Sequence, residues 1–201
     1  MPRQNRVTPE GEILAVAARG MFMGNRGCLH DAGGNLGAAR WRHPHWVCCV
    51  LAFKGRKRAL MQPRRYTELF FLDEAVAMAA GHRPCAECRR AEYEQFRAAF
   101  PGGPLAAPEM DRVLHAARVL PRHQQVFVSD ISALPDGAYV KFQHRNEALL
   151  VHGTHLLPYT PEGYGVALAR PPSGSVKVLT PHPTVAALAA GYRPILHTSA
   201  G

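Results

Sequence analysis

The chain has 201 residues, a formal net charge of +9 and 47% hydrophobic residues. A chain of this length can bury the core of one domain or of two small ones. It contains no apolar run of about 18 residues, which argues against a membrane span. Residues 1–6 are not followed by the apolar core of a signal peptide, so we expect a cytoplasmic protein with no membrane partner.

Local patterns predict helices and strands in both halves of the chain. The first half is expected to contain a short helix over 12–19, a glycine-rich loop or hairpin over 20–37, strands at 46–53 and 67–71, and helices over 72–80 and 89–100. A linker rich in proline and glycine is expected at 101–108. After it we expect a helix over 109–120, short strands at 125–129, 137–143, 148–151, 165–169 and 176–179, and an alanine-rich helix that ends at Gly191.

The most informative motif is a pair of cysteines, Cys85 and Cys88, just after the helix over 72–80. Gly81 is a typical C-terminal cap, and Pro84 prevents the helix from resuming. The turn should therefore present both thiols together, which is how half of a tetrahedral zinc site is usually built. A redox pair is the alternative. The odd total of five cysteines and a reducing compartment favour metal or redox chemistry over structural disulfides.

A zinc ion normally takes four ligands, so two more residues must complete the site. Cys28 and His30 lie in the glycine-rich loop, where the backbone can bend around an ion, and they are our first candidates. Cys49 is the substitute ligand. It lies in an expected strand next to Cys48, and only one of these two neighbours can face the site, because side chains alternate along a strand.

The segment from Phe71 to Cys88 resembles the metal-binding module of Ada-type DNA repair proteins, which closes on Arg-Pro-Cys, two residues and Cys. The resemblance covers residues 20–90 and is specific in its last third. It implies a small α/β zinc module that contacts a DNA backbone. The family's Cys-x3-Cys spacing is absent, and Met23 and Gly24 lie where its methyl-accepting cysteine is expected. We therefore do not transfer methyl-acceptor activity.

A cluster of cations lies between the two expected strands of the first half. An aromatic residue follows it and can stack on an exposed base, while the cations can neutralise phosphates. A solvated hairpin is the alternative. The candidate nucleic-acid-binding residues are Lys54, Arg56, Lys57, Arg58, Arg64, Arg65 and Tyr66. Arg83, Arg89 and Arg90 are expected to add charge beside the metal turn.

A general base for a metal-activated water would have to come from a nearby carboxylate. Glu68 is the weak catalytic candidate, while Asp73 and Glu74 suit the first turn of a helix, where negative charge opposes the dipole. The sequence contains no phosphate-binding loop of recognised form and no His-Glu-x-x-His. Whether the chain is an enzyme therefore stays open.

Together these patterns predict an α+β protein. Residues 1–100 are expected to form the Ada-like zinc module with its basic loop, a small zinc-stabilised α/β unit. Residues 101–201 are expected to form a mostly antiparallel β-rich unit with flanking helices, ending in a short helix. The leading function is zinc-containing nucleic-acid binding, with DNA favoured over RNA as the partner. The alternatives are a metal-dependent enzyme acting on DNA, RNA or a modified nucleotide, and a structural zinc protein with a protein partner.

Overall fold

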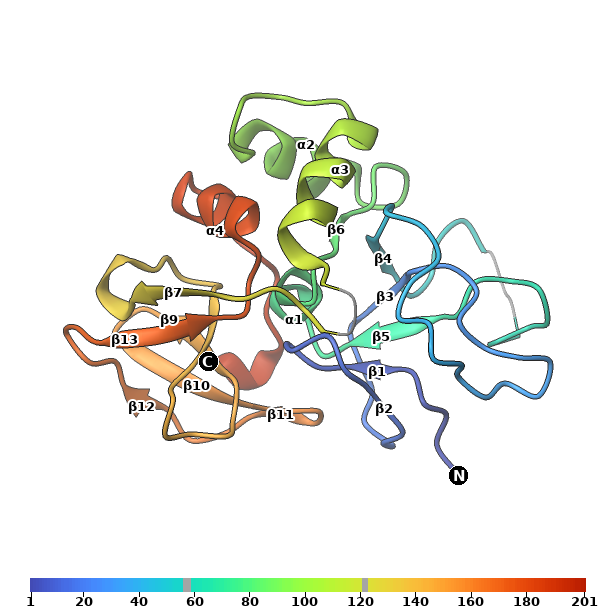
Figure 1. Cartoon of the computed structure of the whole chain (residues 1–201), viewed down its shortest axis with the longest axis horizontal. Helices are drawn as coiled ribbons and strands as arrows, with labels where there is room; N and C mark the ends of the chain where they lie inside the picture. Colours follow the sequence, from blue (N-terminus) through green and yellow to red (C-terminus); the bar gives the residue numbers. More distant parts are fainter. Residues whose placement is uncertain (56–58, 121–122) are drawn as a thin grey trace.

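The computed structural model describes residues 1–55, 59–120 and 123–201 and shows an α+β architecture (Figure 1). Helices accompany a mixed sheet and an antiparallel sheet, which confirms the predicted fold class. Both strand-rich regions come from short segments, because proline and glycine interrupt the chain every few residues.

The first sheet is mixed and has the strand order β2-β1-β5-β3-β4-β6. Pairings β1 with β5 and β4 with β6 are parallel, and the others are antiparallel. Its strands are β1 (Arg6–Val7), β2 (Ile13–Leu14), β3 (Phe22–Asn25), β4 (Val47–Val50), β5 (Leu69–Phe71) and β6 (Arg83–Pro84).

The second sheet is antiparallel and has the order β11-β10-β9-β8-β13-β7, with β12 paired to β10. Its central strands β8 and β9 are apolar and buried on both faces, as expected for strands covered on both sides. Its strands are β7 (Phe127–Asp130), β8 (Tyr139–Lys141), β9 (Leu149–His152), β10 (His155–Thr160), β11 (Gly163–Tyr164), β12 (Leu168–Ala169) and β13 (Ser175–Val178).

Helix α1 (Glu74–Ala79) lies between the two sheets and contacts β3, β4 and β5 of the first and β8 of the second (Figure 1). Its side chains are fully buried, and three of its six residues are alanines, which lets both sheets approach its backbone. Asp73 caps its N-terminus by accepting a hydrogen bond from the Val76 amide. Gly81 ends it with φ of 87°, a conformation that favours glycine.

Three further helices cover the region above α1 in Figure 1: α2 (Arg90–Ala99), α3 (Ala107–Arg118) and α4 (His182–Ala189). Helix α4 contacts both α2 and α3. Tyr93 and Phe96 of α2 and Leu114 of α3 point into the core, in agreement with the helical spacing of apolar residues in the sequence. Short 3-10 turns lie at Ile131–Ala133 and Thr198–Ala200.

Both hydrophobic clusters draw residues from before and after residue 100. One cluster combines Phe22 and Phe71 with Tyr139 and Leu150, and the other combines Met78 with residues of β8, β9 and β13. The carboxylates at the start of α1 add polar contacts to the last residues of the chain. The two halves are therefore packed through shared cores.

The structure corrects three expectations about local structure. The helix expected over 12–19 is wrong, because this segment forms β2 and pairs with β1 instead. In the region 20–37, for which a loop or hairpin was expected, Phe22–Asn25 form β3, an interior strand of the first sheet. Strand β10 had not been expected, because Pro158 interrupts its pattern. Proline has no N–H to donate, so a strand tolerates it at a position whose nitrogen makes no hydrogen bond to a neighbouring strand.

Candidate metal centre

Three cysteines lie close enough together to hold a metal ion: Cys49, Cys85 and Cys88. Their sulfur atoms all lie within 4.8 Å of one another, and all three side chains are half-buried. A tetrahedral zinc ion with Zn–S bonds of about 2.3 Å would separate its sulfurs by about 3.8 Å. The cluster thus needs only a slight contraction to fit such an ion.

The backbone of the first sheet brings these cysteines together. Cys49 belongs to β4, and β6 runs parallel to β4 with Cys48 opposite Pro84. The amide of Cys85 donates to the carbonyl of Cys48 at 3.0 Å, which extends the ladder by one bond. The turn after β6 then returns Cys88 to the same place. A parallel strand pair and one turn therefore fix three ligands from two segments distant in sequence.

Alternation along β4 separates the two neighbouring cysteines. Cys48 is fully buried in the core beneath α1, whereas Cys49 lies on the opposite face of the strand beside Cys85. Burial raises the pKa of Cys48, so its thiol remains protonated and acts as a small core residue. Cys49 is therefore the member of the pair that faces the cluster.

The three thiols share hydrogen bonds that favour one thiolate. The Cys49 thiol donates to Cys85 and, with backbone amides of Cys88 and Glu87, lowers the pKa of Cys85 to about 5. The same hydrogen bond, together with burial, raises the pKa of Cys49, and burial with the nearby Cys85 thiolate raises that of Cys88. A second negative charge is unfavourable here without a cation, and a divalent metal ion removes that penalty.

The cluster provides three ligands rather than four. Within residues 1–55, 59–120 and 123–201, no further Cys, His, Asp or Glu side chain joins it. Sites with three protein ligands and one exchangeable position are typical of catalytic zinc, whereas closed structural sites have four. The chemistry of the donors also favours zinc over hard cations, because thiolates are soft ligands.

The structure places Cys28 and His30 outside this cluster. Both ring nitrogens of His30 already have partners: Nδ1 lies 2.6 Å from the Thr67 hydroxyl and Nε2 lies 3.2 Å from the Gln62 carbonyl. The Cys28 thiol donates to the His30 carbonyl. These contacts hold the loop over 20–37 against the segment before β5, so the geometry supports Cys49 rather than this pair beside the CxxC motif.

The described part of the basic loop is exposed. It begins directly after β4, and the side chains of Lys54, Arg64 and Arg65 are solvent-accessible, with Tyr66 half-buried. The candidates Arg56, Lys57 and Arg58 lie outside the described residues. The arginines expected to add charge beside the metal turn are engaged in ion pairs and are therefore largely unavailable to a nucleic acid. Arg83 pairs with Asp111 and Arg89 with Glu74 in the interior. Arg90 is exposed and pairs with Glu94.

The nearby carboxylates have structural partners. Glu68 is buried, and one of its oxygens accepts a hydrogen bond from the Met61 amide at 2.7 Å. Asp73 caps α1, and Glu74 forms an ion pair with Arg89 at 2.8 Å. None of the three belongs to the group of potential metal ligands among the described residues. The sequence gives no separate signal for these roles beyond the capping pattern at α1.

Comparisons of the chain with protein families, with curated proteins and with solved structures find no match. In the part of the chain that the structure describes, the helices are too short or too polar to cross a bilayer. The site must therefore be interpreted from its own geometry.

Proposed function

We propose that this protein binds zinc through Cys49, Cys85 and Cys88 and binds the backbone of a nucleic acid through the basic loop that follows Cys49. The observation that carries the proposal is the convergence of three cysteine sulfurs within 4.8 Å. The zinc ion would tie β4 to the turn after β6 and so fix the position at which the loop leaves the sheet.

Charge and exposure support nucleic acid as the partner. The chain carries a net charge of +9, and Lys54, Arg64 and Arg65 project from the loop without an ion pair to any described carboxylate. Such side chains can each neutralise a phosphate with little sequence preference. The resemblance of the segment from Phe71 to Cys88 to Ada-type modules favours DNA over RNA.

A second candidate function is supported by the coordination number. Three thiolate ligands leave one position open, which suits a metal-bound water or substrate and hence a metal-dependent enzyme acting on nucleic acid or a modified nucleotide. This alternative does not depend on Glu68, whose carboxylate is buried and bonded to the backbone.

Measuring the zinc content of the purified protein and its variants tests the proposed metal centre. We expect about one zinc per chain in purified protein, lost in Cys49→Ser, Cys85→Ser and Cys88→Ser. Cys48→Ser is the matched control, since it alters the neighbouring thiol on the other face of β4, and Cys28→Ser and His30→Ala test the ligands first expected from the sequence. Metal-free wild type, or retention of zinc in Cys49→Ser, would contradict the proposed ligand set.

Proton release gives a second measure of the same site. At neutral pH the Cys85 thiolate is already formed, whereas Cys49 and Cys88 hold their protons because their pKa values are raised. Zinc binding should therefore release about two protons per ion, and affinity should fall as the pH is lowered. Calorimetry in buffers of different ionisation enthalpy measures this number. Release of no proton would contradict binding through these thiols.

Nucleic-acid binding is tested with fluorescent DNA at several salt concentrations. We expect affinity to fall steeply with salt, and Lys54→Gln, Arg64→Gln and Arg65→Gln each to reduce the slope by roughly one. Arg90→Gln is the matched control, because it removes an exposed cation next to the metal turn but outside the loop. Salt-insensitive or absent binding would favour a protein partner, and product formed in a zinc-dependent way would favour the enzyme.

A further inference from the structure

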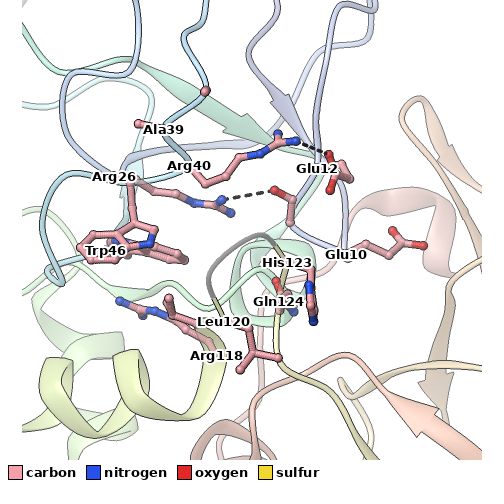
Figure 2. A pocket seen from close by; sticks show the side chains of 14 residues that line it. Glu10, Glu12, Arg26, Ala39, Arg40, Trp46, Arg118, Leu120, His123 and Gln124 are labelled. Carbon is pink, nitrogen blue, oxygen red and sulfur yellow. Dashed lines mark hydrogen bonds and ion pairs between the residues drawn. The ribbon is translucent and has the colours of Figure 1, made fainter.

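A cavity of about 620 Å³ lies where the N-terminal segment, the loop before β4 and the end of α3 meet (Figure 2). Arg26 and Gln124 of its wall bond to the carbonyls of Ala80 and Ala79 at the C-terminal end of α1. Its walls combine aromatic and cationic side chains with apolar ones and with the carboxylates of Glu10 and Glu12. The lining residues that matter here are Arg26, Arg40, Trp41, Trp46, Arg118 and Gln124. A volume of this size is typical of pockets that enclose a small organic ligand.

Two of these arginines are buried cations without a matching anion. Arg26 is 3% exposed and Arg118 is 1% exposed. Among the described residues, neither forms an ion pair with a carboxylate, and the acidic residues of the cavity are already engaged: Glu12 pairs with Arg40 at 3.3 Å and Glu10 with Lys141 at 3.7 Å. Buried charges are normally paired, so this is an unusual arrangement.

The groups that hold the two arginines are neutral. Figure 2 shows the indole of Trp46 between their side chains, and both guanidinium carbons lie over its ring, 4.3 Å from its centroid for Arg26 and 3.8 Å for Arg118. Backbone carbonyls accept from them, those of Gly11 and Ala80 from Arg26 and those of Gly81 and Pro44 from Arg118.

These contacts leave both charge and donors unsatisfied. The Nε atoms of Arg26 and Arg118 are buried without a hydrogen-bond partner in the described part of the chain. Burial and the neighbouring Arg40 lower the pKa of Arg26 to about 9 despite the nearby Glu12. Burial and Arg26 lower the pKa of Arg118 despite the nearby Asp111. An anion in the cavity would relieve this repulsion, and phosphate is one of the anions that guanidinium groups recognise through bidentate hydrogen bonds.

The wall also offers a surface for a flat ring. Trp41 is 39% exposed at the cavity, held edge-on by His115 at 4.5 Å between ring centroids. Aromatic side chains in this position bind nucleobases by stacking. We propose that the cavity binds a mononucleotide, whose phosphate lies against Arg26 and Arg40 and whose base stacks on Trp41. This site is separate from the cysteine cluster and does not depend on the function proposed for it.

The chain carries its own probe for this site, because it has two tryptophans and both line the cavity. We would titrate the protein with AMP, GMP, CMP, UMP, adenosine and inorganic phosphate, following tryptophan fluorescence and thermal stability together. The expected result is a saturable change with at least one mononucleotide, with adenosine and inorganic phosphate each at least about tenfold weaker than the best one.

Variants then locate the ligand. Ala39→Phe fills the cavity without altering a charge, and Arg40→Gln removes a partly exposed cation of the wall; the first should abolish binding and the second weaken it about tenfold. Arg26→Met should also abolish binding. If this variant fails to fold, Ala39→Phe and Arg40→Gln still test whether the ligand binds in the cavity. Arg42→Gln is the matched control, two residues from Arg40 and outside the cavity lining, and should bind normally.

Several results would overturn the proposal: no change in either readout with any mononucleotide at millimolar concentration, adenosine or inorganic phosphate binding as tightly as the nucleotides, or unchanged binding in Ala39→Phe. Cys85→Ser and Arg64→Gln should both retain mononucleotide binding. Failure of the zinc or DNA experiments would therefore leave this result intact, and the reverse also holds.

Discussion

The two ends of helix α1 are both buried against charged side chains, but they differ in how those charges are balanced. At the N-terminal end, Asp73 accepts from the Val76 amide at 2.9 Å, the Tyr164 hydroxyl at 2.6 Å and the His197 amide at 3.0 Å. Glu74 beside it accepts from Arg89, Tyr192 and the Ile195 amide. Each carboxylate has its partners, and they tie the end of the chain to the helix.

At the C-terminal end the charged groups are cations that form no ion pair with a described carboxylate, although Glu12 lies near Arg26 and Asp111 near Arg118. The carbonyls of Ala79, Ala80 and Gly81 accept from Gln124, Arg26 and Arg118, respectively. Positive charge is favourable at this end of a helix, yet the partial charges of three carbonyls do not neutralise two guanidinium groups. Arg26, Arg118 and Gln124 also line the cavity.

The difference separates structure from function. A buried charge with a complete set of partners holds the fold together, and nothing further is needed to explain it. A buried charge that lacks a counter-charge and faces a cavity is expected to meet that counter-charge in a ligand. The same reasoning applies to the cysteine cluster, where three thiols converge and at most one is a thiolate without a metal ion.

The largest loss of stability is expected at the N-terminal end of α1, where Arg89 balances the charge of Glu74. Arg89→Met leaves the Glu74 carboxylate buried without its cation, and breaking such a pair from one side costs about 3–5 kcal/mol of the free energy of unfolding. Urea denaturation in the presence of a chelator measures this loss without a contribution from bound metal. Arg90→Met is the control, because its pair with Glu94 is exposed and is worth only about 0.3–0.5 kcal/mol. Equal losses in both variants would contradict the comparison.

The sequence predicted α1 and the caps at both of its ends, but neither the pairing of Glu74 with Arg89 nor the cations at the C-terminal end. An alanine-rich segment, an acidic first turn and Gly81 define α1 and its caps, because these signals lie within one helix. The CxxC turn is equally local. Arg26, Trp46 and Arg118 come together only through the sheet and α3, and no pattern near any of them indicates a cavity.

The cysteine cluster lies between these extremes. Strand alternation indicated that only one of Cys48 and Cys49 faces the site, but the parallel pairing of β4 with β6, which brings Cys49 to the turn, is a long-range feature. Cys28 and His30 were predicted as metal ligands because they lie in a glycine-rich loop. The partners of the His30 ring, Thr67 and Gln62, are more than 30 residues away and leave no local pattern, while the Cys28 thiol bonds to the His30 carbonyl.

An intermediate loss of stability is expected at the C-terminal end of α1, where Arg26 and Arg118 form no ion pair with a described carboxylate. Arg118→Met removes hydrogen bonds to the Gly81 and Pro44 carbonyls but also removes repulsion from Arg26, so we expect a loss of about 1–2 kcal/mol in buffer free of phosphate and nucleotides. The loss should be smaller than that of Arg89→Met. Arg112→Met, at an exposed position of the same helix, should change stability by less than about 0.5 kcal/mol. A loss for Arg118→Met that matches Arg89→Met would mean that its charge is already balanced.

The smallest expected effect is the coupling energy between Arg26 and Arg118, which reports directly on the repulsion between them. If Arg26 and Arg118 repel each other, each single change already relieves that repulsion, and the double change relieves it only once. Removing both should therefore destabilise the protein by more than the sum of the single losses, by at least about 0.5 kcal/mol. A double-mutant cycle with Arg26→Met and Arg118→Met, measured by urea denaturation, gives this coupling. The matched cycle of Arg89→Met with Glu74→Gln should show the opposite sign, a loss smaller than the sum of the single losses, because those partners attract and each is left unpaired by the single change.

A mononucleotide distinguishes the two cycles. Its phosphate would screen the repulsion in the wild type and so stabilise the arginine pair, while the Arg89–Glu74 pair, remote from the cavity lining, should be unaffected. Saturating AMP should therefore increase the loss caused by Arg26→Met and leave that caused by Arg89→Met unchanged. Additive losses for the arginine pair, with no response to AMP, would show that the carbonyls and Trp46 alone suffice to hold both cations, and that the C-terminal end of α1 is as complete as its N-terminal end.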